Sequence, residues 1–401
     1  MTRSDSQQIS VPATLDVQAV EQALNQLWGQ QAGAVSLDEE EGAVMRARVL
    51  NLMVYVATRA ALGEVEEALA EVTAAHPCRA LVMLAEDAGG TDKDIEMFIS
   101  SHCQADARAG NERHLCCEQV TLIAGGRFRV ELPSAATPLL VSDLPVFLWW
   151  RDAPRLNDQI FDRLSRASDR VVLDSADFPR PYDDLLALAA LLRRGGATDA
   201  AISDLNWARL TSWRTLLASF YDVHEYRAAL DRISRVRVEY VRSDAAAAAA
   251  GAIAPKALIL AGWLASRLGW SPAPEPSRAA GTEEDSHLFL MDKGGHRVNV
   301  EFQPVERAAT MRGWIARVVL TAEAEPQSTF VVSRSEDGRY LETRAVSGEG
   351  TRATRTLTGG DKSEAELLGR ELEILSHDRI YEEAVDAAAG MLVSASTGSA
   401  G

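Results

Sequence analysis

The first part of the chain alternates short apolar runs with segments whose apolar residues recur at helical spacing. The near-continuous apolar run Val49–Ala57 predicts a strand buried on both faces, because a half-exposed strand carries polar residues at alternate positions. The segment Glu64–Ala75 predicts a helix that the dipeptide His76-Pro77 ends. Arg79–Ala85 is strand-like again. This strand–helix–strand order predicts a parallel pair joined by a right-handed crossover.

The same alternation of apolar runs with segments of helical spacing continues to residue 270. Further strands are expected at Cys116–Ala124, Arg127–Leu132, Val146–Trp150, Arg170–Asp174 and Ile233–Val241. Helices are expected after Gly89-Gly90, at Asp158–Ala167, Tyr182–Arg193 and Asp204–Tyr221, and from Pro255 to near Gly269. Residues 45–270 are therefore predicted to form an α/β domain on an open, mostly parallel sheet with flanking helices. Residues 1–44 are expected to form an arm and a first helix.

The pattern changes after Ser271–Asp285, whose Pro-rich, polar composition predicts a linker. Short strands follow, with hairpin turns expected at Gly294-Gly295 and Asp337-Gly338. A final helix is expected to begin at the capping box Ser363-x-x-Glu366 and to bury Leu368, Leu372 and Leu375. Residues 286–392 are predicted to form a smaller antiparallel α+β module, and residues 393–401 a tail. The predicted strands are His287–Met291, Arg297–Phe302, Trp314–Thr321, Thr329–Arg334 and Tyr340–Val346.

Charge narrows the classes of partner. The 401 residues include 41 Lys plus Arg against 58 Asp plus Glu, a net charge of -17. This surplus argues against nucleic acid and anionic membranes, because phosphate binding needs clustered cations. The polar start of the chain argues against an export signal, and four cysteines argue against a disulfide framework. Its apolar runs are too short to span a bilayer, so a cytoplasmic protein is expected.

Common catalytic and cofactor motifs are missing from the sequence. No G-x-G-x-x-G follows Val49–Ala57, and there is no P-loop, H-E-x-x-H or G-x-S-x-G. Gly89-Gly90 could present backbone amides to an anion, but Asp87, Asp92 and Asp94 crowd it with negative charge, so a plain loop is favoured. The sequence therefore assigns no catalytic residue and no cofactor.

One cluster has residue types that suit zinc: His102, Cys103, His114, Cys116 and Cys117. It lacks a C-x-x-C spacing, and adjacent residues of a strand point to opposite faces. Structural thiols are therefore favoured over a metal site. Cys103, Cys116 and Cys117 remain candidate redox thiols.

Two aromatic segments are the best candidates for binding another protein. In Asp143–Asp152 (DLPVFLWWRD), one of Trp149 and Trp150 is expected to reach a crevice beyond the sheet, and Arg151 to emerge at its open edge. The second segment, Ser203–Arg214 (SDLNWARLTSWR), mixes polar and aromatic side chains as interface hot spots do. Alternatively, its tryptophans join neighbouring parts of the fold. The candidate anchors there are Asp204, Asn206, Trp207, Arg209, Trp213 and Arg214.

These segments also carry a resemblance to a known family. Together with Asp169–Phe178, Leu260–Trp270 and Glu371–Ala384, they resemble in order the OpcA family of glucose-6-phosphate dehydrogenase assembly proteins. The resemblance also touches His76–Leu84 and Cys116–Leu122 and implies an accessory protein of the oxidative pentose phosphate pathway. Such a protein binds glucose-6-phosphate dehydrogenase, promotes its active oligomer and raises its activity. For cyanobacterial members, the resemblance also implies that the redox state of thiols influences this activation.

Two other functions stay open at this point. An enzyme acting on sugar phosphates would need a basic pocket, for instance around Arg151, Arg209 and Arg214. A metabolite-sensing α/β protein would bind a small ligand and report it to the dehydrogenase.

Overall fold

The computed structural model describes residues 17–35, 44–46, 48–86, 92–105, 114–194, 200–242, 252–273, 286–307, 313–323, 327–347, 350–359 and 362–398. The chain divides into two compact units. The first comprises Met1–Leu173, Gly195–Ser203 and Ser363–His377. The second comprises Asp174–Arg194, Asp204–Lys362 and Asp378–Gly401. The chain therefore leaves and re-enters each unit more than once.

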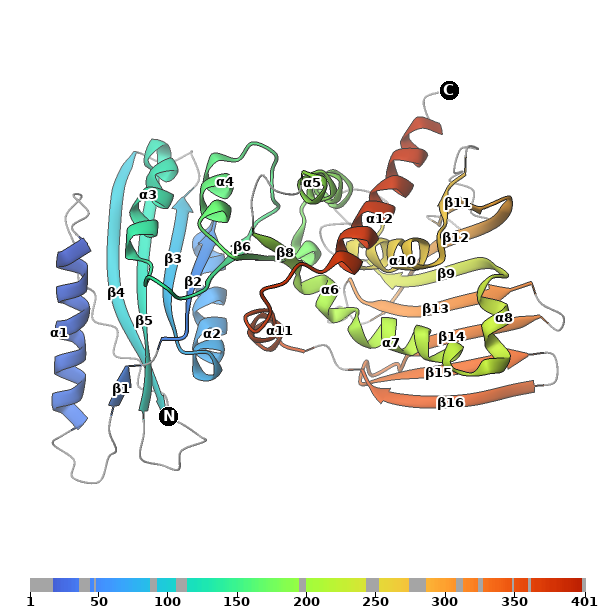
Figure 1. Cartoon of the computed structure of the whole chain (residues 1–401), viewed down its shortest axis with the longest axis horizontal. Coiled ribbons are helices and arrows are strands. Elements are labelled where there is room, and N and C mark those ends of the chain that lie inside the picture. Colours follow the sequence, from blue (N-terminus) through green and yellow to red (C-terminus); the bar gives the residue numbers. More distant parts are fainter. Residues whose placement is uncertain are drawn as a thin grey trace. The chain divides into compact units, whose positions relative to one another are not determined.

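The first unit is built on a sheet with the strand order β1-β5-β3-β2-β6-β7-β8 and with β4 beside β5 (Figure 1). Its strands are β1 (Val44–Arg46), β2 (Leu50–Val56), β3 (Cys78–Glu86), β4 (Lys93–Ala105), β5 (His114–Gly125), β6 (Val146–Arg151), β7 (Arg170–Leu173) and β8 (Ala201–Asp204). The strands from β1 to β7 on this path pair in parallel, whereas β4 pairs antiparallel with β5. The order reverses between β2 and β6, the point at which open α/β sheets hold their ligands.

Burial on both faces explains the apolar strands of this sheet. All seven residues of β2 are buried, as expected for a central strand covered by helices. Thr58 caps the following helix α2 by accepting a hydrogen bond from the backbone N–H of Ala61. Besides α2 (Arg59–Ala75), the helices of the unit are α1 (Val17–Val35), α3 (Leu132–Ala136), α4 (Gln159–Arg166) and α11 (Glu364–Glu371), with the 3-10 helices η1 (Gly126–Glu131) and η2 (Thr137–Leu139).

Two expected elements of the first unit are wrong. Residues after Gly89-Gly90 form strand β4, not a helix, because Met97, Ile99 and Ser101 are buried at a period of two against β5. The expected strand Arg127–Leu132 instead lies mostly in the 3-10 helix η1, whose first residue, Gly126, has a left-handed conformation with φ 58°.

The second unit is built on a sheet with the order β10-β11-β12-β9-β13-β14-β15-β16 (Figure 1). Its strands are β9 (Ile233–Val241), β10 (Ser271–Pro272), β11 (His287–Lys293), β12 (His296–Val305), β13 (Ile315–Ala322), β14 (Ser328–Arg334), β15 (Tyr340–Ser347) and β16 (Gly350–Thr358). All neighbours are antiparallel except β9 and β12. The hairpin turns expected at Gly294-Gly295 and Asp337-Gly338 are confirmed, while β16 was not foreseen.

Helices of the second unit cover the apolar face of this sheet, with α10 against β9 and α7 against β14. They are α5 (Pro181–Arg193), α6 (Leu205–Arg209), α7 (Thr211–Ser219), α8 (Arg227–Leu230), α10 (Pro255–Leu268) and α12 (Arg379–Gly398), with the 3-10 helices η3 (Ser175–Asp177), η4 (Phe220–Asp222) and η5 (His224–Tyr226). The α10 and α12 backbones meet at Gly262, where an added Cβ would lie 2.8 Å from the backbone nitrogen of Ala388. The expected α/β sheet and antiparallel α+β part are thus both present.

The division between the units differs from the expected boundary at 271–285, of which residues 274–285 lie outside the described residues. Strand β9, expected in the first domain, is a central strand of the second sheet, pairing with β12 and β13. The single final helix is two helices, the capped α11 in the first unit and α12 in the second. Leu368 and Leu372 are buried, but Leu375 follows α11 and is 53% exposed. No helix among the described residues combines the length and apolar character of a membrane span.

Candidate functional site

A buried group of polar side chains lies in the second unit, where the segment after β7, the start of α6 and the start of α12 converge. Asp204 has no exposed surface and caps α6 by accepting from the backbone N–H of Asn206 at 2.8 Å. Its carboxylate also accepts from the backbone N–H and the hydroxyl of Ser175, at 2.9 and 2.6 Å. The hydroxyl of Tyr381 approaches at 3.4 Å. One carboxylate therefore ties three segments together.

A second carboxylate, Asp174, adds negative charge beside Asp204. Asp174 caps η3 through the backbone N–H of Ala176 and accepts the guanidinium of Arg209 at 2.7 Å. Burial, with the charge of Asp174, raises the pKa of Asp204 from 3.8 to about 7, although hydrogen bonds from Ser175 oppose this rise. Asp204 is thus poised to hold a proton near neutral pH.

The enclosure of Asp204 limits what the cluster can do chemically. Asn206 donates from Nδ2 to the Ser175 hydroxyl at 3.0 Å, and its buried Oδ1 has no hydrogen-bond partner. Neither Asp204 nor Asn206 reaches solvent, so neither is open to a substrate. Arg209 is the more accessible member, with 15% of its side chain exposed, but Asp174 already neutralises it. The arrangement is that of a junction that stores a proton, not of a general base facing a cleft.

Trp207 joins α6 to the start of α12 within the same unit. Its indole N–H donates to Asp378 at 2.8 Å, and Asp378 also accepts from the backbone N–H of Tyr381. The guanidinium carbon of Arg214 lies 3.4 Å from the centre of a Trp207 ring, and burial lowers the pKa of Arg214 to about 10. Trp213 is buried as well. Both tryptophans of this segment therefore serve the core, while Arg214 remains half-buried.

The expectation that one of the paired tryptophans reaches a crevice is wrong. Trp149 and Trp150 are 0% and 1% exposed. Adjacent residues point to opposite faces of β6, and since both faces are covered, each ring enters a core. Trp150 stacks on Tyr55 of β2 with ring centroids 3.8 Å apart, and Phe161 meets its edge at 5.0 Å.

Charged side chains of the first unit form ion pairs beside the position where its sheet order reverses. Arg151, expected at an open edge, instead forms ion pairs with Glu64 of α2, at 2.7 Å, and with Glu364 of α11. On the other side of this position, Arg59 at the start of α2 pairs with Glu86 at the end of β3. Dinucleotide-binding sheets use an acidic residue near the end of this strand to hold a ribose hydroxyl. In this chain the acid at that end, Glu86, is already paired with Arg59.

The turn from β2 into α2 lacks the glycines that a dinucleotide needs. Thr58-x-Ala60-x-x-Gly63 stands where G-x-G-x-x-G would stand. The Thr58 side chain takes up the backbone N–H of Ala61, one of the donors that a pyrophosphate would use. The methyl group of Ala60 replaces the glycine that permits close approach of the phosphates. The sheet therefore has the strand order of a dinucleotide-binding fold, but it lacks the loop that would bind the dinucleotide.

The candidate redox thiols fall mostly outside the described side chains. The backbone pairs Cys103 with Cys116 across β4 and β5, but these two side chains are not described. Cys117 is buried and accepts a hydrogen bond from the backbone N–H of Cys78 at 3.4 Å. Its hydrogen bond to Cys78, together with burial, raises the pKa of the Cys78 thiol. Sequence reasoning missed Cys78 as a neighbour of Cys117.

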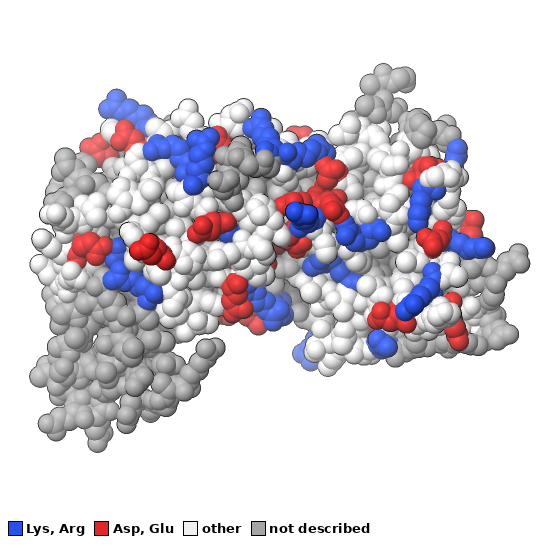
Figure 2. All heavy atoms as spheres, viewed as in Figure 1, with Lys and Arg blue, Asp and Glu red and all other residues white. Residues whose placement is uncertain are grey.

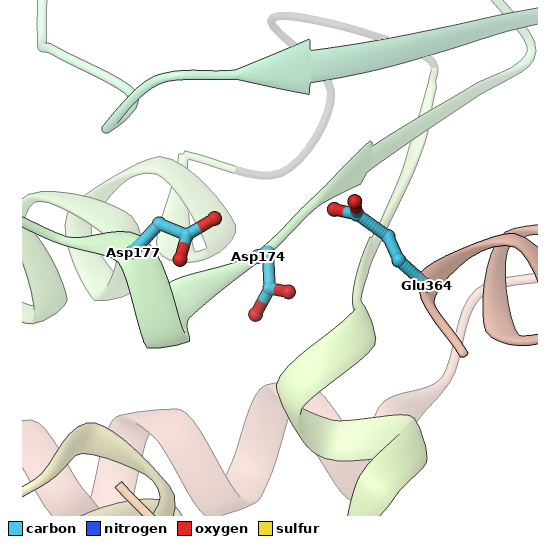
Figure 3. Close-up of side chains that lie close together, drawn as sticks. All are labelled: Asp174, Asp177 and Glu364. Atoms are coloured by element: carbon cyan, nitrogen blue, oxygen red, sulfur yellow. The ribbon is translucent and has the colours of Figure 1, made fainter. Parts of the chain in front are cut away.

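Figure 3 shows Asp174 and Asp177 on the segment that follows β7, and labels Glu364 at the start of α11. Asp174 and Asp177 belong to the second unit, and Glu364 belongs to the first. Within either unit taken by itself, the described side chains bring no three carboxylates, histidines or cysteines to one point.

Four residues of the Asp204 cluster were missed by sequence reasoning. They are Asp174, Ser175, Asp378 and Tyr381. A usable signal existed for the first two, since Asp174 directly follows a predicted strand and the ends of neighbouring strands share one edge of a sheet. Asp378 lies more than 170 residues further along the chain, so no local pattern connects it to Trp207.

Comparison with known proteins assigns the chain to a family. Residues 69–190 match the glucose-6-phosphate dehydrogenase subunit N-terminal domain of OpcA proteins, and residues 200–385 match the corresponding C-terminal domain. These matches cover most of the chain. It belongs to the OpcA family of glucose-6-phosphate dehydrogenase subunits.

Relatives in this family are named as OxPP cycle proteins OpcA. The chain is 28% identical over 326 residues to the protein of Nostoc punctiforme and 27% identical over 319 residues to that of Synechocystis. The matches cover 80% and 78% of this chain but only 66% and 63% of those relatives, so the chain spans less than two thirds of their length.

Solved structures similar to the whole chain are distant. One from Bacillus subtilis, described as the oxidoreductase yvaA, has a TM-score of 0.46 and 10% identity and covers 88% of this chain and 97% of its own. The UDP-N-acetylglucosamine 3-dehydrogenase GnnA of Acidithiobacillus ferrooxidans has a TM-score of 0.44 and 13% identity, covering 88% of this chain and 99% of its own.

Charged side chains of both signs are mixed on the face that Figure 2 shows. Among the described residues, ion pairs join Arg267 to Glu383 and Arg193 to Asp386. On that face, the described residues form no extended basic area of the kind that binds a phosphate backbone.

Proposed function

We propose that this OpcA-family chain is a non-catalytic cytoplasmic subunit that binds glucose-6-phosphate dehydrogenase and promotes its assembly and activation. Family membership supports the partner, since both matched domains are described as parts of a glucose-6-phosphate dehydrogenase subunit. The names of the relatives support the pathway.

The observation that carries the non-catalytic role is that the turn after β2 lacks the glycines of a dinucleotide-binding loop. Thr58 and Ala60 replace two glycines, and Arg59 engages the acid at the end of β3. A dinucleotide-binding enzyme needs glycines at the first two of these positions and an acidic side chain that is available to the ribose. In the proposed complex, the dinucleotide and the sugar phosphate both bind to the dehydrogenase.

The anchors for the dehydrogenase are proposed to lie in the segment Ser203–Arg214. Burial divides the expected anchors into two groups. Asp204, Trp207 and Trp213 are buried and hold the segment in place. Arg209 and Arg214 retain exposed surface and can meet a partner, as arginine does at many interfaces.

Activation requires little binding energy. A subunit activates when it binds the active state of the dehydrogenase more tightly than the inactive state. A tenfold shift of that equilibrium corresponds to about 1.4 kcal/mol of differential binding. One or two arginine anchors are sufficient for such a difference.

Two of the three arginines expected in a sugar-phosphate pocket already form ion pairs. A sugar-phosphate enzyme or a metabolite sensor needs cations that are free to meet an anion. Arg151 is paired with Glu64, and Arg209 with Asp174. Neither arginine therefore offers an uncompensated positive charge.

The test is an activity assay of the purified chain alone and with the dehydrogenase. The chain alone is expected to show no turnover, and to raise the kcat or lower the KM of its partner. Arg214→Ala should weaken dehydrogenase binding roughly tenfold, whereas Ser212→Ala, an exposed change on the same helix, should not. Turnover by the chain alone, or an unchanged dehydrogenase in its presence, would overturn the proposal.

A further inference from the structure

One face of the second sheet is left open by the helices of its unit. Five neighbouring strands, β12, β9, β13, β14 and β15, present three residues each on this side, in three rows that the strand register aligns. We name these fifteen residues the open face. They are Asn299, Arg235, Thr321, Thr329 and Val346 in the upper row, Glu301, Arg237, Val319, Val331 and Arg344 in the middle row, and Gln303, Glu239, Arg317, Ser333 and Glu342 in the lower row.

The alternation of burial shows that the described helices do not cover the open face. Fourteen of its residues are half-buried or exposed, and Val331 alone is buried, with 7% of its surface exposed. Residues at the intervening positions, such as Val236, Val318 and Val332, are fully buried under the helices. The open face is therefore an outer layer of the sheet with small side chains at its centre.

The open face is the centre of a larger sheet surface, and that whole surface is as large as a stable protein interface. The seven longer strands of the sheet, which add β11 and β16 to the five strands of the open face, span roughly 900 Å² at a spacing of about 4.8 Å and about 3.3 Å per residue. A specific interface buries about 800 Å² on each partner. Two such faces can stack about 10 Å apart, as the two layers of a β-sandwich do.

Charge distinguishes the open face from the rest of the molecule. It carries four arginines against three glutamates, a surplus of one positive charge, whereas the whole chain carries -17. Two copies of so acidic a chain repel each other through most surfaces, and least through a face that is close to neutral.

The rows of the open face are complementary to themselves. On β9, Arg237 of the middle row is followed by Glu239 of the lower row, and on β15 Arg344 of the middle row stands next to Glu342 of the lower row. A two-fold axis that runs between these two rows brings each of these arginines opposite the corresponding glutamate of a second copy. A two-fold interface uses the same patch on both subunits, so such self-complementarity is what it requires.

Part of this charge is free to make new ion pairs. Arg237 already pairs with Glu301 at 3.0 Å. Among the described residues, by contrast, nothing forms an ion pair or a hydrogen bond with the side chains of Glu342 and Arg344. We propose that the open face is a two-fold interface through which this chain associates with a second copy of itself.

Sedimentation velocity on the full chain, without the dehydrogenase, tests this proposal. The wild-type chain is expected to sediment as a dimer at micromolar concentration. Val319→Asp, at the centre of the open face, should raise the dimer dissociation constant at least roughly tenfold. The control Val223→Asp, an exposed valine between η4 and η5, should leave it unchanged. The melting temperature of each variant shows whether it folds.

A charge exchange adds a test that a merely structural role would not pass. Glu342→Arg and Arg344→Glu each place like charges opposite each other across the two-fold axis, and each should weaken the dimer. The double variant restores opposite charges and should recover it. A monomeric wild-type chain, a dimer that Val319→Asp does not weaken, or a double variant no better than the single ones overturns the proposal. Loss of dehydrogenase binding by Val319→Asp from a monomeric chain would instead assign the open face to the dehydrogenase.

Discussion

Replacing Asp204 by asparagine should remove the contribution of this one carboxyl group to the pH dependence of stability. Asp204 is fully buried, and its pKa is raised from 3.8 to about 7, first by burial and then by the charge of Asp174. Asparagine resembles the protonated acid in shape and carries no charge. Its carbonyl oxygen can keep the two backbone N–H bonds from Ser175 and Asn206.

The size of the change in the free energy of unfolding follows from the pKa shift, and its sign follows from proton linkage. Between pH 4 and pH 7 the folded chain holds a proton on Asp204 that the unfolded chain has lost. The unfolded state therefore binds fewer protons, so the free energy of unfolding falls as pH rises through this window. A pKa raised from 3.8 to about 7 corresponds to a loss of about 4 kcal/mol in total, since each pH unit is worth about 1.4 kcal/mol. Above about pH 8 this group adds little further change.

The assay is urea unfolding of the wild-type chain and Asp204→Asn at pH 4, 5, 6, 7 and 8. The other titrating groups are the same in both proteins, so the difference between the two curves isolates Asp204. That difference should fall by about 4 kcal/mol from pH 4 to pH 8. Infrared spectroscopy at pH 5 provides a direct check, because the wild-type chain should show a protonated-carboxyl carbonyl band that the variant lacks. Parallel stability curves for the two proteins would refute the reasoning.

Four further predictions concern other sites. Arg209→Ala leaves Asp174 without its cation and should lower the free energy of unfolding by about 1 to 3 kcal/mol, with partial recovery in Arg209→Lys, measured by urea unfolding. Gly262→Ala should cost about 1 to 3 kcal/mol, because the added Cβ meets the backbone of α12 at Ala384. In contrast, Gly63→Ala, with open space around it in α2, should stabilise by up to about 1 kcal/mol in the same measurement. Addition of NADP should not raise the melting temperature of the chain, because the loop after β2 lacks the glycines of a dinucleotide site.

The sequence predicted most elements but not where each one packs. The alternation in Ile233–Val241 correctly indicated a half-exposed strand, and β9 has that burial pattern. Periodicity reports how a segment is covered, however, and not by which neighbour. The place of β9 between β12 and β13, and the division of the final helix between two units, depend on contacts far apart in the chain.

The same limit applies to the candidate site. The chemical character of Ser203–Arg214 and the absence of a dinucleotide loop after β2 were readable directly from residue types and spacing. Which of these side chains are enclosed was not readable, because a tryptophan or an aspartate looks the same in a sequence whether its far side meets solvent or protein.

The amino-acid sequence by itself determined most of the strands and helices, the acidic charge and the family, because these depend on local periodicity and on ordered motifs. The tertiary structure alone decided that Trp149 and Trp150 are both buried, and that Asp204 is enclosed beside Asp174 with its pKa raised. It also decided that fifteen residues from five strands form one neutral face on an acidic chain. The physical reason is that burial and electrostatic environment arise from neighbours that folding brings from distant segments, and no local window of sequence contains them.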